Sequence, residues 1–276
     1  MSASPYLSVV VPVFNEEESI PILAREIAAS LDPLGLPYEV LWVDDGSTDR
    51  GPEVLRGLAA ADPRARVLRL ATNSGQSAAM AAGFRYARGE VLATLDADLQ
   101  NDPADLPRLL AALDGCDVVC GVRARRRDSW VRRVSSRLAN AVRNRATGEA
   151  VTDVGCTLRV YRRDLVTAVP MFTGMHRFLP TLLRLAGARV RELPVHHRPR
   201  LHGVAKYGIH NRLWRGIVDL MAVRWMQRRW IDPRRVEEIT SWTTETCGSG
   251  SASPDRASSS AASSSSGSLR SGGSRA

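Results

Sequence analysis

Short apolar runs alternate with amphipathic stretches along the first hundred residues. The runs are rich in β-branched residues, which is typical of buried parallel strands, and they lie at 7–14, 38–43, 67–70 and 91–95. Between them, apolar residues recur at helical spacing, most clearly at Ile20, Leu23, Ile27 and Leu31. This alternation predicts an α/β fold with a doubly wound, mostly parallel sheet and helices on both faces.

The pattern continues less regularly after residue 100. Further strands are expected at 116–123, 151–161 and 188–195. Residues 130–142 and 210–230 combine arginines with apolar residues at helical spacing, which predicts two basic amphipathic helices. Such helices either lie in a membrane interface or pack on the domain through their apolar stripe, and the sequence leaves both interpretations open.

Composition divides the chain into three parts. The alternation of elements predicts one domain over residues 1–209. Residues 210–240 contain the second basic helix, in which tryptophans and arginines are interspersed. Residues 241–276 are rich in Ser, Gly and Ala without periodicity, and are expected to form a disordered tail.

Charge is distributed unevenly. Residues 1–120 contain 9 Lys and Arg against 18 Asp and Glu, so the net charge of +9 leaves about +18 on the remainder. A basic second half favours anionic partners: phosphates, nucleic acid or an anionic membrane surface. No run approaches the roughly 20 apolar residues of a membrane-spanning helix. Because the four cysteines show no paired spacing and the first residues do not resemble a signal peptide, we expect a cytoplasmic protein that meets membranes peripherally.

Carboxylates follow several of the predicted strands. Asp44 and Asp45 come after the second strand, Asp96 and Asp98 after the fourth, and Glu16 shortly after the first. The carboxyl ends of parallel strands meet at one edge of a sheet, so these residues are expected to lie close together. Grouped carboxylates repel one another unless a cation neutralises them, and oxygen ligands suit Mg²⁺ or Mn²⁺ shared with a diphosphate. The alternative for the second pair is a simple turn into the next helix.

A glycine-containing segment near residue 200 carries cations that a diphosphate would need. Arg200 can bind phosphate oxygens as a bidentate fork, and Lys206 as a point charge. His196, His197 and His202 in the same region raise the question of zinc. Adjacent histidines point to opposite sides of a strand, however, and no cysteine or carboxylate cluster completes a ligand set. The segment therefore favours phosphate binding.

Several motifs together resemble a known family. Val-Val-Pro-Val-Phe-Asn-Glu at 10–16, Asp-Asp-Gly-Ser-Thr-Asp at 44–49, Asn73 with Gly75, and Asp-Ala-Asp-Leu-Gln at 96–100 are similar to family 2 glycosyltransferases of the GT-A fold. Asp-Val-Gly-Cys at 153–156 with Arg159, and Arg-x-x-Gly-x-x-Lys-Tyr at 200–207, resemble the polyprenyl-phosphate branch, which includes dolichol-phosphate mannosyltransferases and undecaprenyl-phosphate sugar transferases. The resemblance covers roughly residues 6–230 and implies a Rossmann-like GT-A domain.

The resemblance also implies a reaction and its residues. A nucleotide-diphosphate sugar of the GDP-mannose or UDP-hexose type would donate its sugar, with inversion, to a polyprenyl phosphate, using Mg²⁺ or Mn²⁺. The implied donor-binding residues are Pro12, Phe14, Glu16, Val43, Asp45, Asp96, Ala97, Asp98, Arg123, Arg200 and Lys206. The implied metal ligands are Asp96, Asp98 and Gln100. The implied catalytic residues are Asp98, Asp153 near the acceptor and Arg177 on the lipid phosphate.

Two questions stay open. Asp153 acts either as a base or as an organiser of arginines, and an ionised lipid phosphate favours the second role because it needs no base. The acceptor could instead be a polysaccharide or another hydroxyl compound, which would require a lone catalytic base in place of a basic pocket. A nucleic-acid-binding module is disfavoured because the arginine runs lack interleaved aromatic residues.

Overall fold

The computed structural model describes residues 4–123, 144–145, 147–148, 152–199 and 209–231. Contacts divide the chain into two units, Met1–Asp232 and Pro233–Ala276. The described residues all belong to the first unit. The predicted helix at 130–142, the segment with Arg200 and Lys206, and the predicted tail at 241–276 lie outside them.

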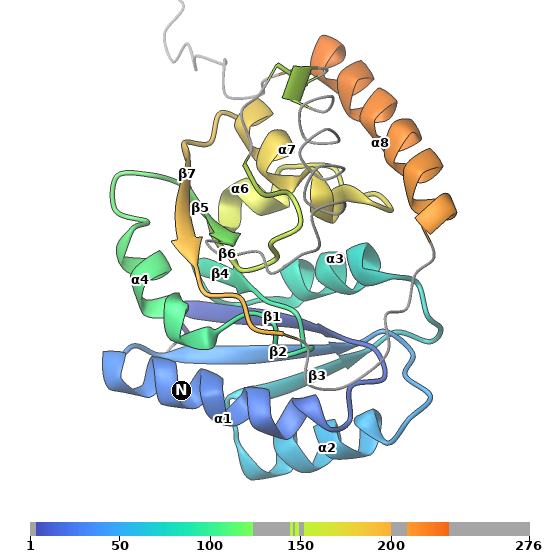
Figure 1. Cartoon of the computed structure of the whole chain (residues 1–276). Helices are drawn as coiled ribbons and strands as arrows, with labels where there is room; N and C mark the ends of the chain where they lie inside the picture. Colours follow the sequence, from blue (N-terminus) through green and yellow to red (C-terminus); the bar gives the residue numbers. More distant parts are fainter. Residues whose placement is uncertain (1–3, 124–143, 146, 149–151, 200–208, 232–276) are drawn as a thin grey trace, which may run out of the picture. The chain divides into compact units, whose positions relative to one another are not determined.

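A seven-stranded sheet forms the centre of the described fold (Figure 1). Its strands are β1 Leu7–Val13, β2 Tyr38–Asp44, β3 Ala65–Arg69, β4 Val91–Thr94, β5 Val118–Arg123, β6 Arg159–Arg162 and β7 Val190–Val195. Their order is β3-β2-β1-β4-β6-β5-β7. β6 pairs antiparallel with β4 and β5, whereas every other neighbouring pair is parallel. The predicted doubly wound, mostly parallel sheet is confirmed.

Helices cover both faces of the sheet. They are α1 Ser19–Leu31, α2 Gly51–Ala61, α3 Gln76–Tyr86, α4 Leu106–Ala111, α6 Arg163–Thr167, α7 Leu179–Leu185 and α8 Ile209–Arg229. Short 3₁₀ turns lie at Asp32–Leu34, Pro103–Asp105 and Met175–Arg177. Figure 1 shows α1 and α2 on one side of β1–β3 and α3 on the other.

Alternate residues of each central strand enter two separate cores. Val9 and Val11 pack with α1, α2 and α4, whereas Val10 packs with α3 on the opposite face. This follows from the two-residue period of a strand. It also explains why β1 and β2 are apolar throughout, because a parallel strand covered on both faces is buried on both.

Two local predictions are wrong. Within the stretch predicted at 151–161, the described residues 152–158 are not a strand, and the strand begins at Arg159. The Asp153 carboxylate accepts hydrogen bonds from Arg123 and from the backbone N–H of Gly155, which bends the chain before the strand. The acidic residues 16–18 are suited to the first turn of a helix, yet α1 begins only at Ser19. They form the loop between β1 and α1 instead.

Candidate active site at the carboxyl edge of the sheet

A pocket of about 150 Å³ opens where β1, β2 and β4 end. Seven of its lining residues are predicted donor-binding residues: Pro12, Phe14, Glu16, Asp45, Asp96, Ala97 and Asp98. Val13, Asn73 and Gln76 complete the lining. The side chain of Val43, also a predicted donor-binding residue, is fully buried in the core and does not line the pocket. The structure therefore brings carboxylates from three strand ends together.

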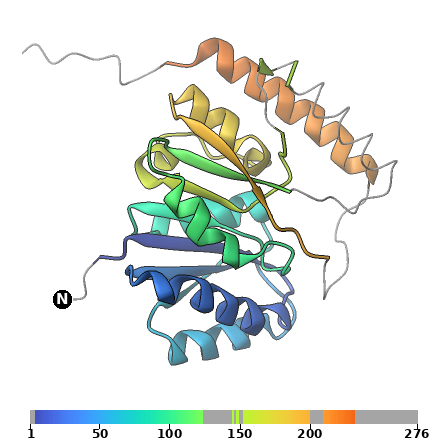
Figure 2. The same ribbon diagram turned by 60° about the vertical axis from the view of Figure 1, so that its left-hand side comes forward.

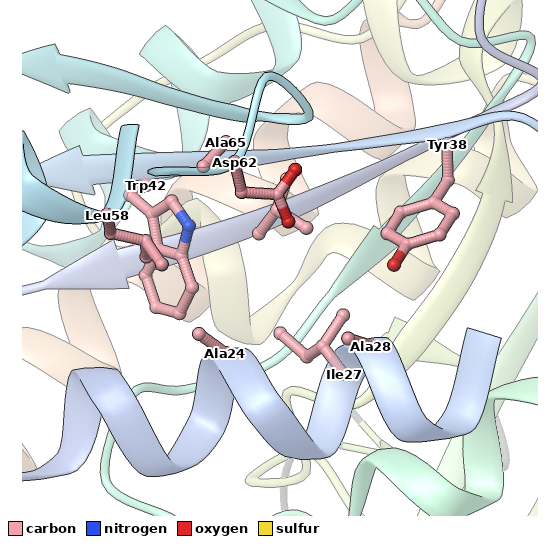
Figure 3. Close-up of a pocket in the computed structure, with 9 residues that line it drawn as sticks. Ala24, Ile27, Ala28, Tyr38, Trp42, Leu58, Asp62 and Ala65 are labelled. Atoms are coloured by element: carbon pink, nitrogen blue, oxygen red, sulfur yellow. The ribbon is translucent and has the colours of Figure 1, made fainter. Parts of the chain in front are cut away.

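A second hollow lies between α1, α2 and β2, on the face away from α3 (Figure 3). Its volume is about 20 Å³, enough for about one water molecule. Trp42 borders it, and the buried Nε1 of this residue has no hydrogen-bond partner among the residues that the structure describes. This hollow is too small for a nucleotide, so the pocket at the strand ends is the candidate site.

Hydrogen bonds between loops fix the wall of the pocket after β1. Asn15 adopts a positive φ of 52°, and its Oδ1 accepts the backbone N–H of Thr48 at 2.8 Å. The backbone N–H of Asn15 in turn donates to Ser47 Oγ at 3.0 Å. The loops after β1 and β2 are thereby held together beside Glu16.

The two neighbouring aspartates after β2 have different tasks. Asp44 accepts the backbone N–H of Ser47 at 2.9 Å and forms an ion pair with Arg69 at 3.2 Å, so it stabilises its own loop. Asp45 lines the pocket and accepts the backbone N–H groups of Ser74 at 2.7 Å and Gly75 at 2.8 Å. Asp45 therefore also fixes the loop that leads into α3.

The first residue of α3 reaches the carboxylate pair. Gln76 Nε2 donates to Asp96 Oδ1 at 2.7 Å. Sequence reasoning did not assign Gln76 or its neighbour Asn73 to the site, although both follow the third strand. Their position on the same edge as the other strand ends was the signal that could have found them.

The backbone after β4 is bent so that Asp96 and Asp98 both line the pocket. Leu99 has a φ of 62°, which few non-glycine residues adopt, and its side chain is fully buried. Asp98 Oδ1 accepts the backbone N–H of Gln100 at 3.2 Å. Strained backbone of this kind is concentrated at functional sites.

This arrangement fits a divalent cation shared with a ligand. Among the described residues, no three His, Cys, Asp or Glu side chains gather closely enough to hold a metal by themselves. Mg²⁺ and Mn²⁺ do not need such a cage, because Mg²⁺ in particular is held by one or two carboxylates together with phosphates and waters. Asp96 and Asp98, which both line the pocket, would supply the carboxylates for such an ion.

Arg123 and Asp153 form a largely buried ion pair. Arg123 Nε lies 2.6 Å from Asp153 Oδ2, and Nη2 lies 2.7 Å from Oδ1. The side chains are 16% and 6% exposed. A guanidinium that contacts both oxygens of a carboxylate neutralises the carboxylate's charge. This geometry supports a role for Asp153 in organising arginines rather than as a base.

The residues just before Arg200 are hydrogen-bonded to the loop that follows Asp96 and Asp98. His197 forms a β-bridge with Asn101, and the backbone N–H of Arg198 donates to the Gln100 carbonyl at 2.9 Å. The Arg198 guanidinium also pairs with Asp102 at 2.7 Å. The residues that directly precede Arg200 therefore lie beside residues 100–102. His196 Nδ1 lies 3.2 Å from a carboxylate oxygen of Asp105.

Residues 8–169 match the profile of glycosyl transferase family 2. The chain belongs to this family. It is 44% identical over 207 residues to the undecaprenyl-phosphate 4-deoxy-4-formamido-L-arabinose transferase of Edwardsiella ictaluri, and 44% identical over 205 residues to the protein of the same name from Aeromonas hydrophila. Each alignment covers 74% of this chain and 63% of the relative, so the chain spans less than two thirds of these family 2 proteins.

Solved structures show the same fold. Glucosyl-3-phosphoglycerate synthase of Mycobacterium tuberculosis, in complex with Mn²⁺, UDP and phosphoglyceric acid, superposes with a TM-score of 0.61 at 22% identity and covers 82% of this chain and 79% of its own. A mannosyltransferase of Pyrobaculum calidifontis, in complex with GDP-Man and Mn²⁺, gives a TM-score of 0.56 at 21% identity, covering 83% and 65%. At these identities the likeness establishes the GT-A fold.

Proposed function

We propose that this family 2 glycosyltransferase transfers a sugar from a nucleotide-diphosphate sugar to a polyprenyl phosphate. The observation that carries the proposal is the pocket at the strand ends, where Asp96 and Asp98 lie beside Glu16 and Asp45. A pocket with this many carboxylates favours a ligand that arrives with a divalent cation. The names of the relatives from Edwardsiella and Aeromonas support the polyprenyl-phosphate acceptor.

The donor would occupy the pocket, with its base and ribose near Phe14, Glu16 and Asp45 and its diphosphate near Asp96 and Asp98. A Mg²⁺ or Mn²⁺ ion would be held by Asp96, Asp98 and Gln100, and would supply charge neutralisation for the departing nucleoside diphosphate. The complexes of the structural neighbours with Mn²⁺ and a nucleotide support this use of a metal. Gln76 would orient Asp96 for this task through its hydrogen bond.

The acceptor proposal follows from the cations in the basic second half of the chain. A lipid monophosphate is already ionised near neutral pH, so the protein must bring two anionic substrates together and need not remove a proton. Arg123, Arg177, Arg200 and Lys206 are the proposed cations. Asp153 would hold Arg123 in place, because it contacts the guanidinium with both carboxylate oxygens.

We further propose that α8 docks on the surface of an anionic membrane, on its cytoplasmic side. No helix among the described residues is both long and apolar enough to cross a bilayer. Apolar side chains 40–60% exposed share one face of α8, and these are Ile217, Val218, Met221 and Trp225. Arg224, Arg228 and Arg229 are exposed beside this face, and Figure 2 shows α8 at the outer edge of the described fold. Apolar and basic side chains together suit a headgroup layer.

Liposome sedimentation tests the docking. Replacing Met221 and Trp225 by serine is expected to weaken binding to anionic vesicles about tenfold or more, because both apolar side chains would leave the bilayer interface. Tyr86→Ser is the matched control, since Tyr86 is 55% exposed at the end of α3. Equal binding by all three proteins would contradict docking through α8.

The transfer itself is tested with purified protein, polyprenyl phosphate, Mn²⁺ or Mg²⁺ and a panel of UDP- and GDP-sugars, with lipid-linked sugar detected by mass spectrometry. Asp98→Asn is expected to lower the rate about 100-fold or more, because a ligand to the charge-neutralising cation is lost. Asp114→Asn, which alters an exposed turn, should leave the rate unchanged. Failure of the wild-type protein to transfer any sugar to the lipid phosphate would overturn the proposal.

A further inference from the structure

The first two residues of α3 contact different parts of the molecule. Gln76 donates to Asp96 in the pocket, as described above. Ser77, which is only 6% exposed, lies 2.7 Å from His176 Nδ1 through its Oγ. The same Oγ accepts the backbone N–H of Gly174 at 3.0 Å. The first turn of α3 therefore contacts Asp96 through the side chain of Gln76, and the segment Gly174–Arg177 through the side chain of Ser77.

The turn at Met175–Arg177 is held from its other side by a buried arginine. Arg159, 1% exposed, donates from Nη1 to the carbonyl of His176 at 2.9 Å. Its Nη2 donates to the carbonyl of Val154 at 2.9 Å, next to Asp153. A buried guanidinium between two carbonyls ties the turn to the loop that organises Arg123.

Gly174 leaves little freedom at the start of this turn. Its φ of 92° suits glycine, and a Cβ built there would lie 2.5 Å from Asp219 Oδ2 of α8. The backbone at Gly174 is thus placed between Ser77 of α3 and α8. Hydrogen bonds and packing define the position of the turn on three sides.

We propose that Ser77 and His176 are positioning residues: their hydrogen bond holds the turn carrying Arg177 against the donor pocket, so that the acceptor phosphate is bound at the correct distance from the nucleotide sugar. The inference rests on the proposed function and adds to it a link between donor and acceptor sides. The link runs from Asp96 through Gln76 and Ser77 to His176, over atoms 2.7 Å apart at each side-chain contact. Arg177 is the residue through which the pair acts.

Two substitutions of His176 separate positioning from simple loss of a side chain. An asparagine places an amide atom near the position of the ring Nδ1, whereas a glutamine places one near Nε2. His176→Asn therefore can keep the bond to Ser77 and His176→Gln cannot. Ser77→Ala removes the same bond from the other side, and Ser30→Ala, in which a helical serine loses only a bond to its own helix, is the control.

Steady-state kinetics of these variants test the proposal. Ser77→Ala and His176→Gln are expected to raise the KM for polyprenyl phosphate about tenfold, the cost of one buried hydrogen bond, with the KM for the nucleotide sugar within about twofold of wild type. His176→Asn should stay within about threefold for both substrates. Thermal unfolding of each variant shows whether it is folded, and the Asn and Gln variants remain comparable even if Ser77→Ala is not.

Either of two results overturns the positioning role: donor and acceptor KM rising together, or His176→Asn being as impaired as His176→Gln. A wild-type protein that transfers sugar while all variants keep its acceptor KM overturns this inference alone. A wild-type protein that transfers nothing to polyprenyl phosphate overturns the proposed function and this inference with it. The outcomes are therefore distinguishable.

Discussion

Single residues at the strand ends decide what the site can hold. Leu99 and Asn15 are the non-glycine residues with positive φ in the part of the chain that the structure describes, and both flank the pocket. Leu99 is fully buried, so its side chain stabilises the core while its backbone stays in an unfavourable conformation. The fold thus maintains a strained backbone between Asp98 and Gln100.

Substitution of Leu99 tests this strain. Both Leu99→Ala and Leu99→Gly should destabilise the protein by about 2–5 kcal/mol through the lost core side chain. The glycine variant should be about 1 kcal/mol more stable than the alanine variant, since only alanine retains a Cβ at positive φ. At the equally buried Leu95, where φ is not positive, the order should reverse. Urea denaturation measures both pairs, and the same order at both positions would contradict strain at Leu99.

At this scale the sequence allowed only part of the site to be predicted. The carboxylates of the pocket after β1, β2 and β4 could be named because parallel strands bring their ends together, whereas Pro12, Phe14 and Ala97 were named only through the family resemblance. Strand geometry alone did not separate Asp44 from Asp45, because their roles depend on which carboxylate faces Arg69 and which faces the loop at Ser74; only the family resemblance selected Asp45. Gln76 was missed although it follows the third strand, because only the structure shows its hydrogen bond to Asp96.

Elements are joined at the site by loops that approach one another closely. The loop after β2 meets the loop after β3 at Gly46, where φ is 71°. A Cβ on this residue would lie 2.7 Å from the backbone N of Asn73 and 2.8 Å from the carbonyl carbon of Thr72. Both are backbone atoms, so neither can move without shifting the pocket wall at Asn73.

Gly46→Ala is therefore expected to lower the free energy of unfolding by about 2–4 kcal/mol, from strain at positive φ and from overpacking. Gly57→Ala is the matched control: it lies within α2, and among the described residues no atom beyond the local backbone of α2 lies within 4 Å of the added methyl group. That variant should be more stable than wild type by about 0.5–1 kcal/mol, because alanine favours a helix. Equal effects of the two substitutions would show that the loops do not meet at Gly46.

The regular elements were predictable where periodicity was strong. β1, β2, β4 and α1 lie within a few residues of the predicted positions, because buried parallel strands and amphipathic helices have distinct patterns. The stretch 151–161 has strand-forming residues, yet the bonds of Asp153 to Arg123 and Gly155 prevail over this local preference. A side-chain contact thirty residues away has no signature in a local pattern.

At the scale of the whole molecule, the two cores contain ionisable groups that the sequence alone did not reveal. Burial raises the pKa of the Cys120 thiol to about 11 and that of Cys156 to about 11. Both thiols therefore stay protonated in the folded protein well above neutral pH. In the unfolded chain they would ionise at lower pH, near the ordinary value for cysteine.

These shifts predict a loss of stability in alkali. Because the folded-state pKa is raised, the stabilisation is complete below about pH 9 and is lost as pH rises towards about 11, the unfolded state releasing its protons first. The free energy of unfolding should therefore fall by a few kcal/mol across this window. A double variant, Cys120→Ala with Cys156→Ala, should be less stable at pH 8 but show a shallower decline. An unchanged decline in the double variant would contradict the burial of the thiols.

The uneven charge of the chain corresponds to two different surfaces of the described fold. The acidic first half supplies the pocket carboxylates at Glu16, Asp45, Asp96 and Asp98, and the basic second half supplies Arg123 and the exposed arginines of α8. In the proposed reaction a metal ion neutralises the charge of the carboxylates, and anionic lipid neutralises the charge of the arginines. The proposed reaction thus depends on a lipid phosphate as the acceptor.

Comparison of two acceptors with the same isoprenoid chain tests that dependence most directly. Polyprenyl phosphate and the corresponding polyprenol differ only in the phosphate, so the rates of sugar transfer to each, measured with one donor and Mn²⁺, isolate its contribution. We expect sugar transfer to polyprenyl phosphate, with one nucleoside diphosphate released per lipid-linked sugar, and no transfer to polyprenol. Transfer to polyprenol or a sugar hydroxyl, with none to the phosphate, would contradict this expectation.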